Sequence, residues 1–549
     1  MKTIFKFILS IILCTTGTIH LSYAQEQFKI RAWQFHDYNV DYIEKTLKIA
    51  PQYGINTVVF SHNIMWYTEE MFYDHYKPSY INLWSEKARR IGMKAWIWTH
   101  ELNDIPEQFL TAPPKDPQAK RFSAWLGKVH PDFDAGPSKA KIDNPDFWEW
   151  IAAKYRKLFT ILPEVDGMIL SLHETPYRIF DDSTVVSKMS QSERVAKLVE
   201  AINTVCREYH KTLVVRTFVL EPDELDWVYE GLEKSPRDVI VMTKDVPHDW
   251  YPFLPHDPLL GRFKNHTQIL EVGTNAENGG MNYIPYQQAD YIKYRVDYSR
   301  SKGVQGYVAR LDTKNRHVLG TPNEVSLYAM KRFTEDPALG TDSFWKEWAV
   351  LNYGEKAAPF MIRALRPSFD GVNKMFFFLG MWLTDHSRIP PYDYAVGHIS
   401  SRSPAKWEKN SKYKPLEDEL NRPTEETLEK VLAEKDDAIR IQAGCKAELE
   451  KAKEHLSPDV YSDLSRRFDI WRHDAETWRA FAEAFFAYRV FEETKDKTML
   501  YRSERAVDNL EKWAKVTANT FGDDVMEDNP GRTLQFVKQL NAKITAVKK

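Results

Sequence analysis

The sequence predicts an α/β protein: a (β/α)₈ TIM barrel followed by an all-α C-terminal domain. From Phe28 to about Phe333, short apolar runs alternate with amphipathic helical stretches, which is typical of parallel βαβ units. Eight such units in roughly 300 residues match the size of a TIM barrel. After about Glu335, strand signals become few and helical patterns become long. We therefore expect the barrel over 25–335 and the helical domain over 336–549, because 549 residues are too many for one hydrophobic core.

Each predicted strand is a short apolar run bounded by turn residues. The eight runs, in chain order, are Phe28–Trp33, Asn56–Ser61, Lys94–Thr99, Gly167–Leu172, Leu213–Phe218, Val239–Thr243, Gln268–Gly273 and Gly306–Arg310. Apolar residues at helical spacing predict helices between them, most clearly at Asp41–Ala50, Leu83–Ile91, Phe147–Phe159 and Ser192–Tyr209. The connection Asn103–Asn144 is unusually long and follows the C-terminal end of a strand, where loops are commonly functional.

Two long helical stretches dominate the predicted C-terminal domain. Glu425–His455 is charged with recurring Leu, Ile and Ala, and Tyr461–Thr494 is rich in aromatic residues. Asp385–Pro415 is polar, contains Pro and Tyr, and is predicted to form no regular element. A long loop in a helical domain is typical of a functional role, so we expect part of this one to pack over the mouth of the barrel.

The first 24 residues are predicted to form a cleavable signal peptide. Lys2 and Lys6 give a basic start, Phe7–Thr15 is apolar, and Ser22 and Ala24 provide small residues at the cleavage site. The mature protein is therefore expected to be secreted or periplasmic.

Composition argues against two classes of partner. The formal net charge is -3, which gives no general attraction to nucleic acid or to anionic lipid. No later apolar run reaches membrane-spanning length, so we expect neither a nucleic-acid nor a membrane partner. Cys206 and Cys445 lie on helical stretches of different predicted domains, so we expect buried free thiols rather than a disulfide, and no Cys spacing typical of a metal site is present.

Residues that follow the strands of a TIM barrel meet around one pocket. Here that set is rich in His, carboxylates and cations: His36, Asp37, His62, Asn63, His100, Glu101, His173, Glu174, Arg216, Glu221, Lys244, Asp245, His248, Asp249, Asn275, Glu277, Arg310 and Asp312. Hydrolysis of a glycosidic bond needs one carboxylic acid to protonate the leaving oxygen and a second carboxylate to activate water or attack carbon. Glu174 is the predicted acid, because burial beside an apolar strand would raise the pKa of its carboxyl. Asp249 and Glu277 are the candidates for the second role.

The histidines permit another interpretation. His36, His62, His100, His173 and His248 are of the residue type that holds a catalytic metal. No His-x-His pair follows the first strand, however, and histidines beside carboxylates also bind sugar hydroxyls. We therefore expect neither a metal nor another cofactor. A metal-dependent barrel hydrolase remains an alternative.

Four stretches resemble glycoside hydrolase family 67, the α-glucuronidases: Gly167–Glu174, Val215–Val219, Val239–Trp250 and Gln268–Glu277. The family has a Glu acid after its fourth strand and then Arg-Ala-Phe-Val, which 216–219 match except at Thr217. The family's Val-Ile-Val-Gln-Val-Lys-Asn-Gly-Pro-Ile-Asp-Phe is similar to 239–250. Glu277 lies 28 residues past Asp249, the spacing of the family's second carboxylate.

The resemblance implies Glu174 as general acid, with Asp249 and Glu277 positioning and activating water. It also implies that Arg216 and Lys244 contact substrate, and that the helical domain supplies an active-site loop and a homodimer contact. We complete the expected substrate-binding set with other residues from the strand ends and from the matching stretches: His36, His100, Glu101, His173 and Trp250. The sequence departs from the family in having Leu170 and Ala276 where the family has Lys and Gln. We also expect no counterpart of the family's β-rich N-terminal domain, because the predicted barrel starts soon after the predicted signal peptide.

Besides the metal-dependent hydrolase, three functions remain open from the sequence. The leading hypothesis is an inverting exo-glycosidase that removes a terminal sugar, with a uronic acid as one candidate, from plant or algal oligosaccharides. The second is a retaining glycosidase with Glu174 as acid/base and Glu277 as nucleophile. The third is an inactive barrel that only binds carbohydrate. The match at Asp249 favours inversion.

Overall fold

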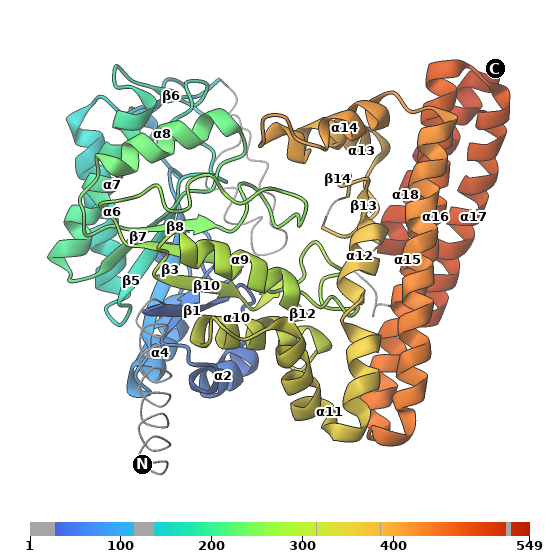
Figure 1. The fold of residues 1–549 in the computed structure, drawn as a ribbon. Helices are drawn as coiled ribbons and strands as arrows, with labels where there is room; N and C mark the ends of the chain where they lie inside the picture. The colour runs from blue at the N-terminus through green and yellow to red at the C-terminus, as the bar shows by residue number, and fades with distance from the viewer. Residues whose placement is uncertain (1–27, 115–136, 314–315, 385, 523–528) are drawn as a thin grey trace, which may run out of the picture.

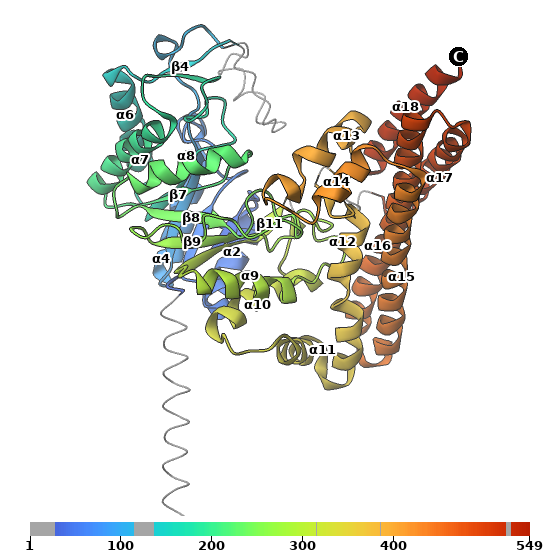
Figure 2. The same ribbon diagram turned by 45° about the horizontal axis from the view of Figure 1, so that its top comes forward.

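The computed structural model of the chain describes residues 28–114, 137–313, 316–384, 386–522 and 529–549. The predicted signal peptide (1–24) and much of the long connection 103–144 lie outside the described residues. The described parts form a barrel, blue to green in Figure 1, and a helical region, yellow to red, that stands beside it. Figure 2 presents the same arrangement from a second direction.

The barrel is closed by eight parallel strands in the order β1-β10-β9-β8-β7-β5-β3-β2. The strands are β1 (Ile30–Phe35), β2 (Thr57–Phe60), β3 (Lys94–His100), β5 (Gly167–Ser171), β7 (Thr212–Arg216), β8 (Ile240–Lys244), β9 (Gln268–Val272) and β10 (Gly306–Arg310). The predicted (β/α)₈ barrel is confirmed, and every predicted strand lies within two residues of an observed one.

Alternating side chains of these strands fill the interior of the barrel. Nine buried residues form this inner core: Ala32, Val59, Trp96, Trp98, Ile169, Val214, Met242, Ile269 and Val308. Side chains on the opposite face of each strand pack beneath the outer helices in a second, larger core. The strands therefore read as nearly continuous apolar runs, as expected where both faces are covered.

The outer layer of the barrel is made of helices between the strands. They are α2 (Val40–Ile49), α4 (Lys77–Arg90), α6 (Pro145–Ile161), α7 (Gln191–Glu208), α8 (Pro222–Glu233), α9 (Ala289–Ser301) and α10 (Val325–Glu335), with the short α3 (Glu70–Tyr73) and the 3₁₀ turns η1 (Ala50–Tyr53), η2 (Glu107–Phe109) and η3 (Pro322–Glu324). α7 begins with a capping box, in which Ser190 and Glu193 satisfy each other's backbone N–H groups. The connections between these elements contain two small two-stranded sheets. One pairs β4 (Ala140–Lys141) with β6 (Val185–Val186), and the other pairs β11 (Asp312–Thr313) with β12 (Arg316–His317).

The rest of the chain is mainly helical, as predicted. It comprises α11 (Thr341–Leu365), α12 (Ser368–Phe376), the hairpin β13 (Phe377–Phe378) and β14 (Met381–Trp382), α13 (Tyr392–Ser401), η4 (Pro404–Lys406), α14 (Lys414–Asn421), α15 (Glu425–Ala452), η5 (Lys453–His455), α16 (Pro458–Thr494), α17 (Lys497–Phe521) and α18 (Asn529–Lys548). The long helices α15 to α18 lie side by side in both views. The aromatic residues of α16, such as Trp471, Trp478 and Phe481, are buried among them.

The prediction of an irregular loop over Asp385–Pro415 was wrong. The segment contains α13, η4 and the start of α14. Tertiary contacts explain this, because Tyr392 at the start of α13 is buried against Phe485 and its hydroxyl donates to Glu492 at 2.6 Å. A short helix fixed by packing carries little signal in its own sequence.

Two further expectations can be compared with the structure. Cys206 and Cys445 are both free and buried, as predicted. Among the helices that the structure describes, none combines the length and apolar character needed to cross a membrane.

Gly306 offers a test of the barrel's packing. A Cβ atom there would lie 2.6 Å from the backbone oxygen of Ile30 on β1, the neighbouring strand. We expect Gly306→Ala to lower the free energy of unfolding by about 1–3 kcal/mol through overpacking. Gly444 is the matched control, because it is exposed on α15 with open space around its Cα. Gly444→Ala should instead raise stability by about 0.5–1 kcal/mol. Equal effects of the two changes in thermal or denaturant unfolding would contradict this account.

Candidate active site

Three carboxylates follow barrel strands at their C-terminal ends. Glu174 follows β5, Asp249 follows β8 and Glu277 follows β9. Because these strands are parallel members of one closed barrel, their loops open on the same end of it. About a third of the side-chain surface of Glu174 and of Asp249 is exposed (33% and 35%), against 12% for Glu277. The charge of Asp249 acts on Glu174, so the two carboxylates lie within electrostatic reach of each other.

The loops that carry Glu174 and Asp249 share one local device. The backbone N–H of Glu174 donates to Nδ1 of His173 at 2.9 Å, and that of Asp249 donates to Nδ1 of His248 at 2.6 Å. Glu174 also has a positive φ of 61°, which a non-glycine residue adopts only when its surroundings hold it there. His173 and His248 thus position the carboxylate that follows each of them.

A cation is paired with each carboxylate. Arg216 Nη1 donates to Glu174 at 3.2 Å, Lys244 Nζ donates to Asp249 at 3.0 Å, and Arg310 Nη1 donates to Glu277 at 2.7 Å. Each cation is the last residue of its strand, so the barrel itself fixes the pairing.

Arg216 has a second carboxylate partner, Glu271 on β9. Its Nε and Nη2 donate to the two oxygens of Glu271 at 2.7 and 3.0 Å. With Nη1 on Glu174, all three nitrogens of Arg216 therefore bind carboxylates of the protein. This arrangement makes Arg216 a residue that neutralises two carboxylates of the site.

The pKa of Glu174 is lowered, which is opposite to the sequence-based expectation. Burial raises the pKa of this carboxyl, but the hydrogen bond and charge of His100 and the charge of Arg216 together outweigh burial. His100 Nε2 lies 3.4 Å from Glu174 Oε2. The prediction considered only the apolar strand that precedes Glu174. His100 and Arg216, which lower the pKa of Glu174, lie at the ends of β3 and β7.

Asp249 is also held ionised. Burial raises the pKa of its carboxyl, but Lys244, His248 and Arg402 bring it well below its ordinary value. Tyr251 lies close to this group: burial, and then the charge of Asp249 with a smaller effect from Glu277, raise the pKa of its phenol. Tyr251 is thus within electrostatic reach of both predicted base-side carboxylates.

Three histidines at the mouth, His36, His62 and His248, are neutral near pH 7. Burial lowers the pKa of His36, of His62 and, to about 3, of His248, with nearby cations acting in the same direction. His36 and His62 stack with ring centroids 3.5 Å apart. His36 Nδ1 accepts from Arg310 Nη2 at 2.7 Å, so the proton of the neutral ring is on Nε2. No hydrogen-bond partner of His36 Nε2 occurs in the described part of the chain, so it can donate to a ligand oxygen.

The same residues do not form a metal centre. Within the described ranges, no group of three or more His, Cys, Asp or Glu side chains is arranged to hold a metal ion. The metal-dependent alternative therefore finds no ligand set in this part of the protein.

Aromatic rings enclose the cations. Lys244 Nζ lies 4.1 Å from the ring centroids of both Phe218 and Trp250. The ring of Trp250 packs directly on Gly273, where a Cβ atom would lie 2.4 Å from the ring. Glycine directly after β9 therefore permits Trp250 to approach Lys244 at the mouth of the barrel.

Glu101 is not brought to the site. Its two oxygens accept from Lys154 Nζ at 2.5 Å and from Tyr155 hydroxyl at 2.6 Å, and both partners belong to α6 of the outer layer. Only 1% of its side chain is exposed. The expectation that Glu101 contacts substrate is therefore corrected. Sequence position placed it at a strand end, but the side chain turns toward the helix.

The helical region does pack on the mouth of the barrel. Ser387 Oγ donates to the backbone oxygen of Glu277 at 3.1 Å and accepts from Gly280 N–H at 3.1 Å. Arg402, just after α13, contacts His248, and Lys406 of η4 pairs with Glu221 at 2.7 Å. Figure 2 shows α13 and α14 lying between the barrel and the long helices.

Sequence reasoning missed three residues of this site. Glu271 lies inside a strand, so a search restricted to strand ends passed over it. Tyr251 follows Asp249 by two residues and could have been found as a loop residue beside a candidate carboxylate. Arg402 comes from the helical region, and no signal in its local sequence connects it to the barrel.

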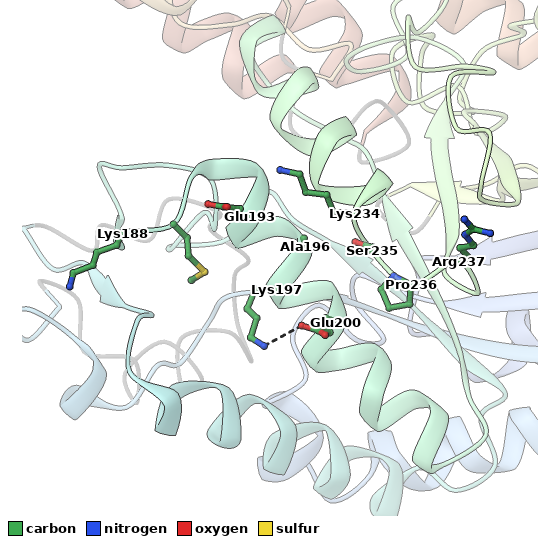
Figure 3. Close-up of a pocket in the computed structure, with 10 residues that line it drawn as sticks. Lys188, Glu193, Ala196, Lys197, Glu200, Lys234, Ser235, Pro236 and Arg237 are labelled. Carbon is green, nitrogen blue, oxygen red and sulfur yellow. Dashed lines mark hydrogen bonds and ion pairs between the residues drawn. The ribbon is translucent and has the colours of Figure 1, made fainter.

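A separate hollow lies in the outer layer, away from these carboxylates. It has a volume of about 620 Å³ and lies beside α7 and the end of α8. Figure 3 shows its rim of mixed charge, where Lys197 and Glu200 pair at 3.1 Å. None of the predicted site residues lines it.

Comparisons with known proteins locate the fold but not the family. A scan against protein-family models gives no match, and a search of curated proteins gives none. Among solved structures, the chain is similar to a GH138 enzyme that targets the pectin rhamnogalacturonan II. That likeness has 10% identity over 95% of this chain and 85% of that chain, with a TM-score of 0.59. At this identity it shows a shared fold.

Two further structural neighbours have lower TM-scores. One is a GH115 4-O-methyl-α-glucuronidase with specificity for decorated arabinogalactans. It has 12% identity over 93% of this chain and 62% of that chain, with a TM-score of 0.49. The other is the Thermobaculum terrenum O-GlcNAc hydrolase, with 11% identity over 95% and 96% of the two chains and a TM-score of 0.45. The resemblance to glycoside hydrolase family 67 stays a prediction.

The placement of Glu101 can be tested by its effect on stability. We expect Glu101→Gln to lower the free energy of unfolding by about 1–3 kcal/mol, because it weakens a buried charged hydrogen bond to Lys154. Glu86→Gln is the control, since Glu86 forms a solvent-exposed pair with Arg90 and should change stability by less than about 0.5 kcal/mol. Unfolding in denaturant measures both. A fully stable Glu101→Gln would show that the buried network is not structural.

Proposed function

We propose that the protein is a glycoside hydrolase that removes a terminal sugar with inversion of configuration. The observation that carries the proposal is the convergence of Glu174, Asp249 and Glu277 at one barrel end, each beside a cation. A glycosidase needs two carboxyl groups on opposite sides of the scissile bond. Support also comes from the resemblance to family 67 and from the fold shared with a GH138 enzyme.

In the proposed reaction Glu174 protonates the leaving oxygen. Asp249 and Glu277 bind one water on the other face of the sugar, where one takes its proton and the other orients it. Lys244 favours the ionised form of Asp249 that a base requires, and Arg310 holds Glu277 in place through hydrogen bonds. His36 Nε2 donates to a sugar oxygen.

To act as the acid, Glu174 must take up a proton when substrate binds. Its carboxyl is ionised in the ligand-free protein because Arg216 and His100 face it. A sugar oxygen entering between these groups would weaken both contacts and let the carboxyl take up a proton. The Arg216 contact of 3.2 Å and the His100 contact of 3.4 Å are long for charge-assisted hydrogen bonds, which favours such a displacement.

The retaining alternative would use Glu277 as nucleophile. Against it, both oxygens of Glu277 accept from Arg310, at 2.7 and 3.3 Å. These two hydrogen bonds fix the orientation of Glu277, which suits a carboxylate that positions a water molecule. Inversion is therefore the proposed stereochemistry.

The substrate class proposed is an oligosaccharide of plant or algal origin. The GH138 neighbour targets a pectin, and family 67 acts on uronic acids. An α-glucuronidase-like specificity is part of the proposal, but Arg216 is occupied by carboxylates of the protein itself and so does not select an acidic sugar alone. Export through the signal peptide and a homodimer through the helical region remain predictions.

The test begins with a panel of aryl glycosides and of plant and algal oligosaccharides. On any substrate that is cleaved, Glu174→Gln and Asp249→Asn should each lower kcat by about 10²–10⁴-fold, since each removes an acid–base group. Glu221→Gln is the matched control: Glu221 lies at the same barrel end but pairs with Lys406 in solvent, and its loss should leave kcat nearly unchanged. Proton NMR in the first turnovers should show the anomer opposite to that of the substrate.

Three results would contradict parts of this proposal. A first product with the anomeric configuration of the substrate, or a sugar trapped on Glu277, would establish retention. Full activity of Glu174→Gln would reject the site. Binding of oligosaccharides without turnover of any of them would favour the inactive carbohydrate-binding barrel.

A pH profile tests the control of Glu174. The hydrogen bond and charge of His100 lower the pKa of this carboxyl, so His100→Asn should raise that pKa. An acid must be protonated to act, and a higher pKa keeps it protonated to higher pH. The basic limb of kcat/KM should therefore move toward higher pH. His75→Asn, at an exposed histidine, is the control and should leave the profile in place. A basic limb that stays put or moves to lower pH in His100→Asn would exclude Glu174 as the acid.

A further inference from the structure

A second cavity lies between the barrel and the helical region. It has a volume of about 310 Å³ and is lined by the loop after β9, by β12 with the turn that follows it, and by α16. We call it the rim pocket. Its volume is at the lower end of the range for small-ligand sites, enough for a single sugar unit.

The lining of the rim pocket is cationic. It contains Arg316 from β12 and Arg466 and Arg467 from α16, against a single carboxylate, Asp463. Asp463 pairs with Arg467 at 2.8 Å and is half exposed, so water screens its charge. A guanidinium group in a cavity favours an anionic ligand, because it binds a carboxylate through two parallel hydrogen bonds.

Two basic residues of the pocket, Arg467 and His317, make structural contacts. Arg467 Nη1 donates to the backbone oxygen of Asn282 at 2.8 Å and so joins α16 to the barrel loop. His317 pairs with Asp37 at 2.8 Å and stacks on Tyr42 at 3.4 Å. These two therefore build the walls.

Arg316 lines the pocket and is held by an aromatic ring. Its guanidinium lies 4.0 Å from the ring centroid of Tyr283, which holds it in place without neutralising it. Among the described residues, no carboxylate forms an ion pair with Arg316, in contrast to Arg216, Lys244 and Arg310 in the catalytic site. A charge that is positioned but not neutralised is suited to receive a ligand.

The rim pocket opens at the same end of the barrel as the catalytic carboxylates. Asn282 and Tyr283 belong to the loop that carries Glu277, and Arg316 follows β10, which ends at Arg310. Contacts also connect the two places: His317 holds Asp37, and His36 beside it contacts Arg310, the partner of Glu277. A saccharide chain that places one unit at Glu277 would have its further units near this rim.

We infer that the rim pocket binds a carboxylate-bearing sugar unit, a uronic acid residue distinct from the unit that is cleaved. This deepens the proposed function, since both units belong to one oligosaccharide. The reacting sugar would bind at the catalytic carboxylates of the barrel. The anionic unit would bind in the rim pocket, which the barrel and the helical region form together.

Binding of free monosaccharides to the full chain tests this inference without relying on turnover. D-glucuronate and D-galacturonate are the probes, with D-glucose and sodium sulfate as companions, followed by NMR titration. We expect uronate binding to weaken about tenfold in Arg316→Met and in Arg466→Met, the loss of one charged hydrogen bond. Arg237→Met, in the outer hollow of Figure 3, is the matched control and should bind as the unaltered protein does. Thermal unfolding confirms that each variant is folded, and Arg466→Met serves should Arg316→Met fail to fold.

Three outcomes would overturn the inference. They are equal uronate affinity in the unaltered protein and both variants, glucose binding as tight as glucuronate binding, and sulfate binding as tight as uronate binding, which would make the pocket a simple anion site. The result is separable from the catalytic proposal. If uronate binding depends on Arg316 but the protein cleaves no substrate, the rim-pocket inference holds and the catalytic proposal fails. Cleavage abolished by Glu174→Gln without any effect of Arg316→Met would leave only the catalytic site.

Discussion

The pairing of buried carboxylates with buried cations at the end of the barrel strands is the constraint on which the rest of the site depends. Arg216 is 5% exposed and its partner Glu271 is 1% exposed. Charged groups with so little exposure to solvent are tolerated only when each is paired with an opposite charge and hydrogen-bonded. Removal of one member of the pair leaves the other charge uncompensated. Because Arg216, Lys244 and Arg310 each end a strand of the same barrel, the closure of the barrel supplies this matching. Glu174 and Asp249 are therefore held ionised by the scaffold itself.

That constraint shapes the chemistry as well as the stability. Cations that favour ionised Asp249 suit the base side of an inverting reaction, whereas the same kind of pairing works against an acid at Glu174. The free protein is thus arranged for the base, and the acid must be completed by substrate. A site that gains a proton only when a sugar separates Glu174 from Arg216 and His100 would avoid a neutral, unpaired carboxyl in the resting state.

The helical region contributes to the site by docking on this charged end. Ser387 binds the loop of Glu277, Arg402 reaches His248, and Arg467 joins α16 to the loop beyond Glu277. Each contact falls on a loop that carries a proposed catalytic residue or on its neighbour. The helical region therefore acts as a wall of the mouth, which accounts for a second cavity at the boundary between the two parts of the chain.

The sequence by itself determined the barrel, its eight strands and the positions of Glu174, Asp249 and Glu277 at one end. These follow from local patterns, since an apolar run with turn residues after it specifies both a strand and the place where its loop opens. Tertiary structure alone decided where side chains point and what they meet. It turned Glu101 toward α6, placed Glu271 on Arg216, made a helix of 392–401 through the burial of Tyr392, and lowered the pKa of Glu174. The physical reason is that charge pairing and burial depend on residues distant in sequence, whose approach a local pattern does not encode.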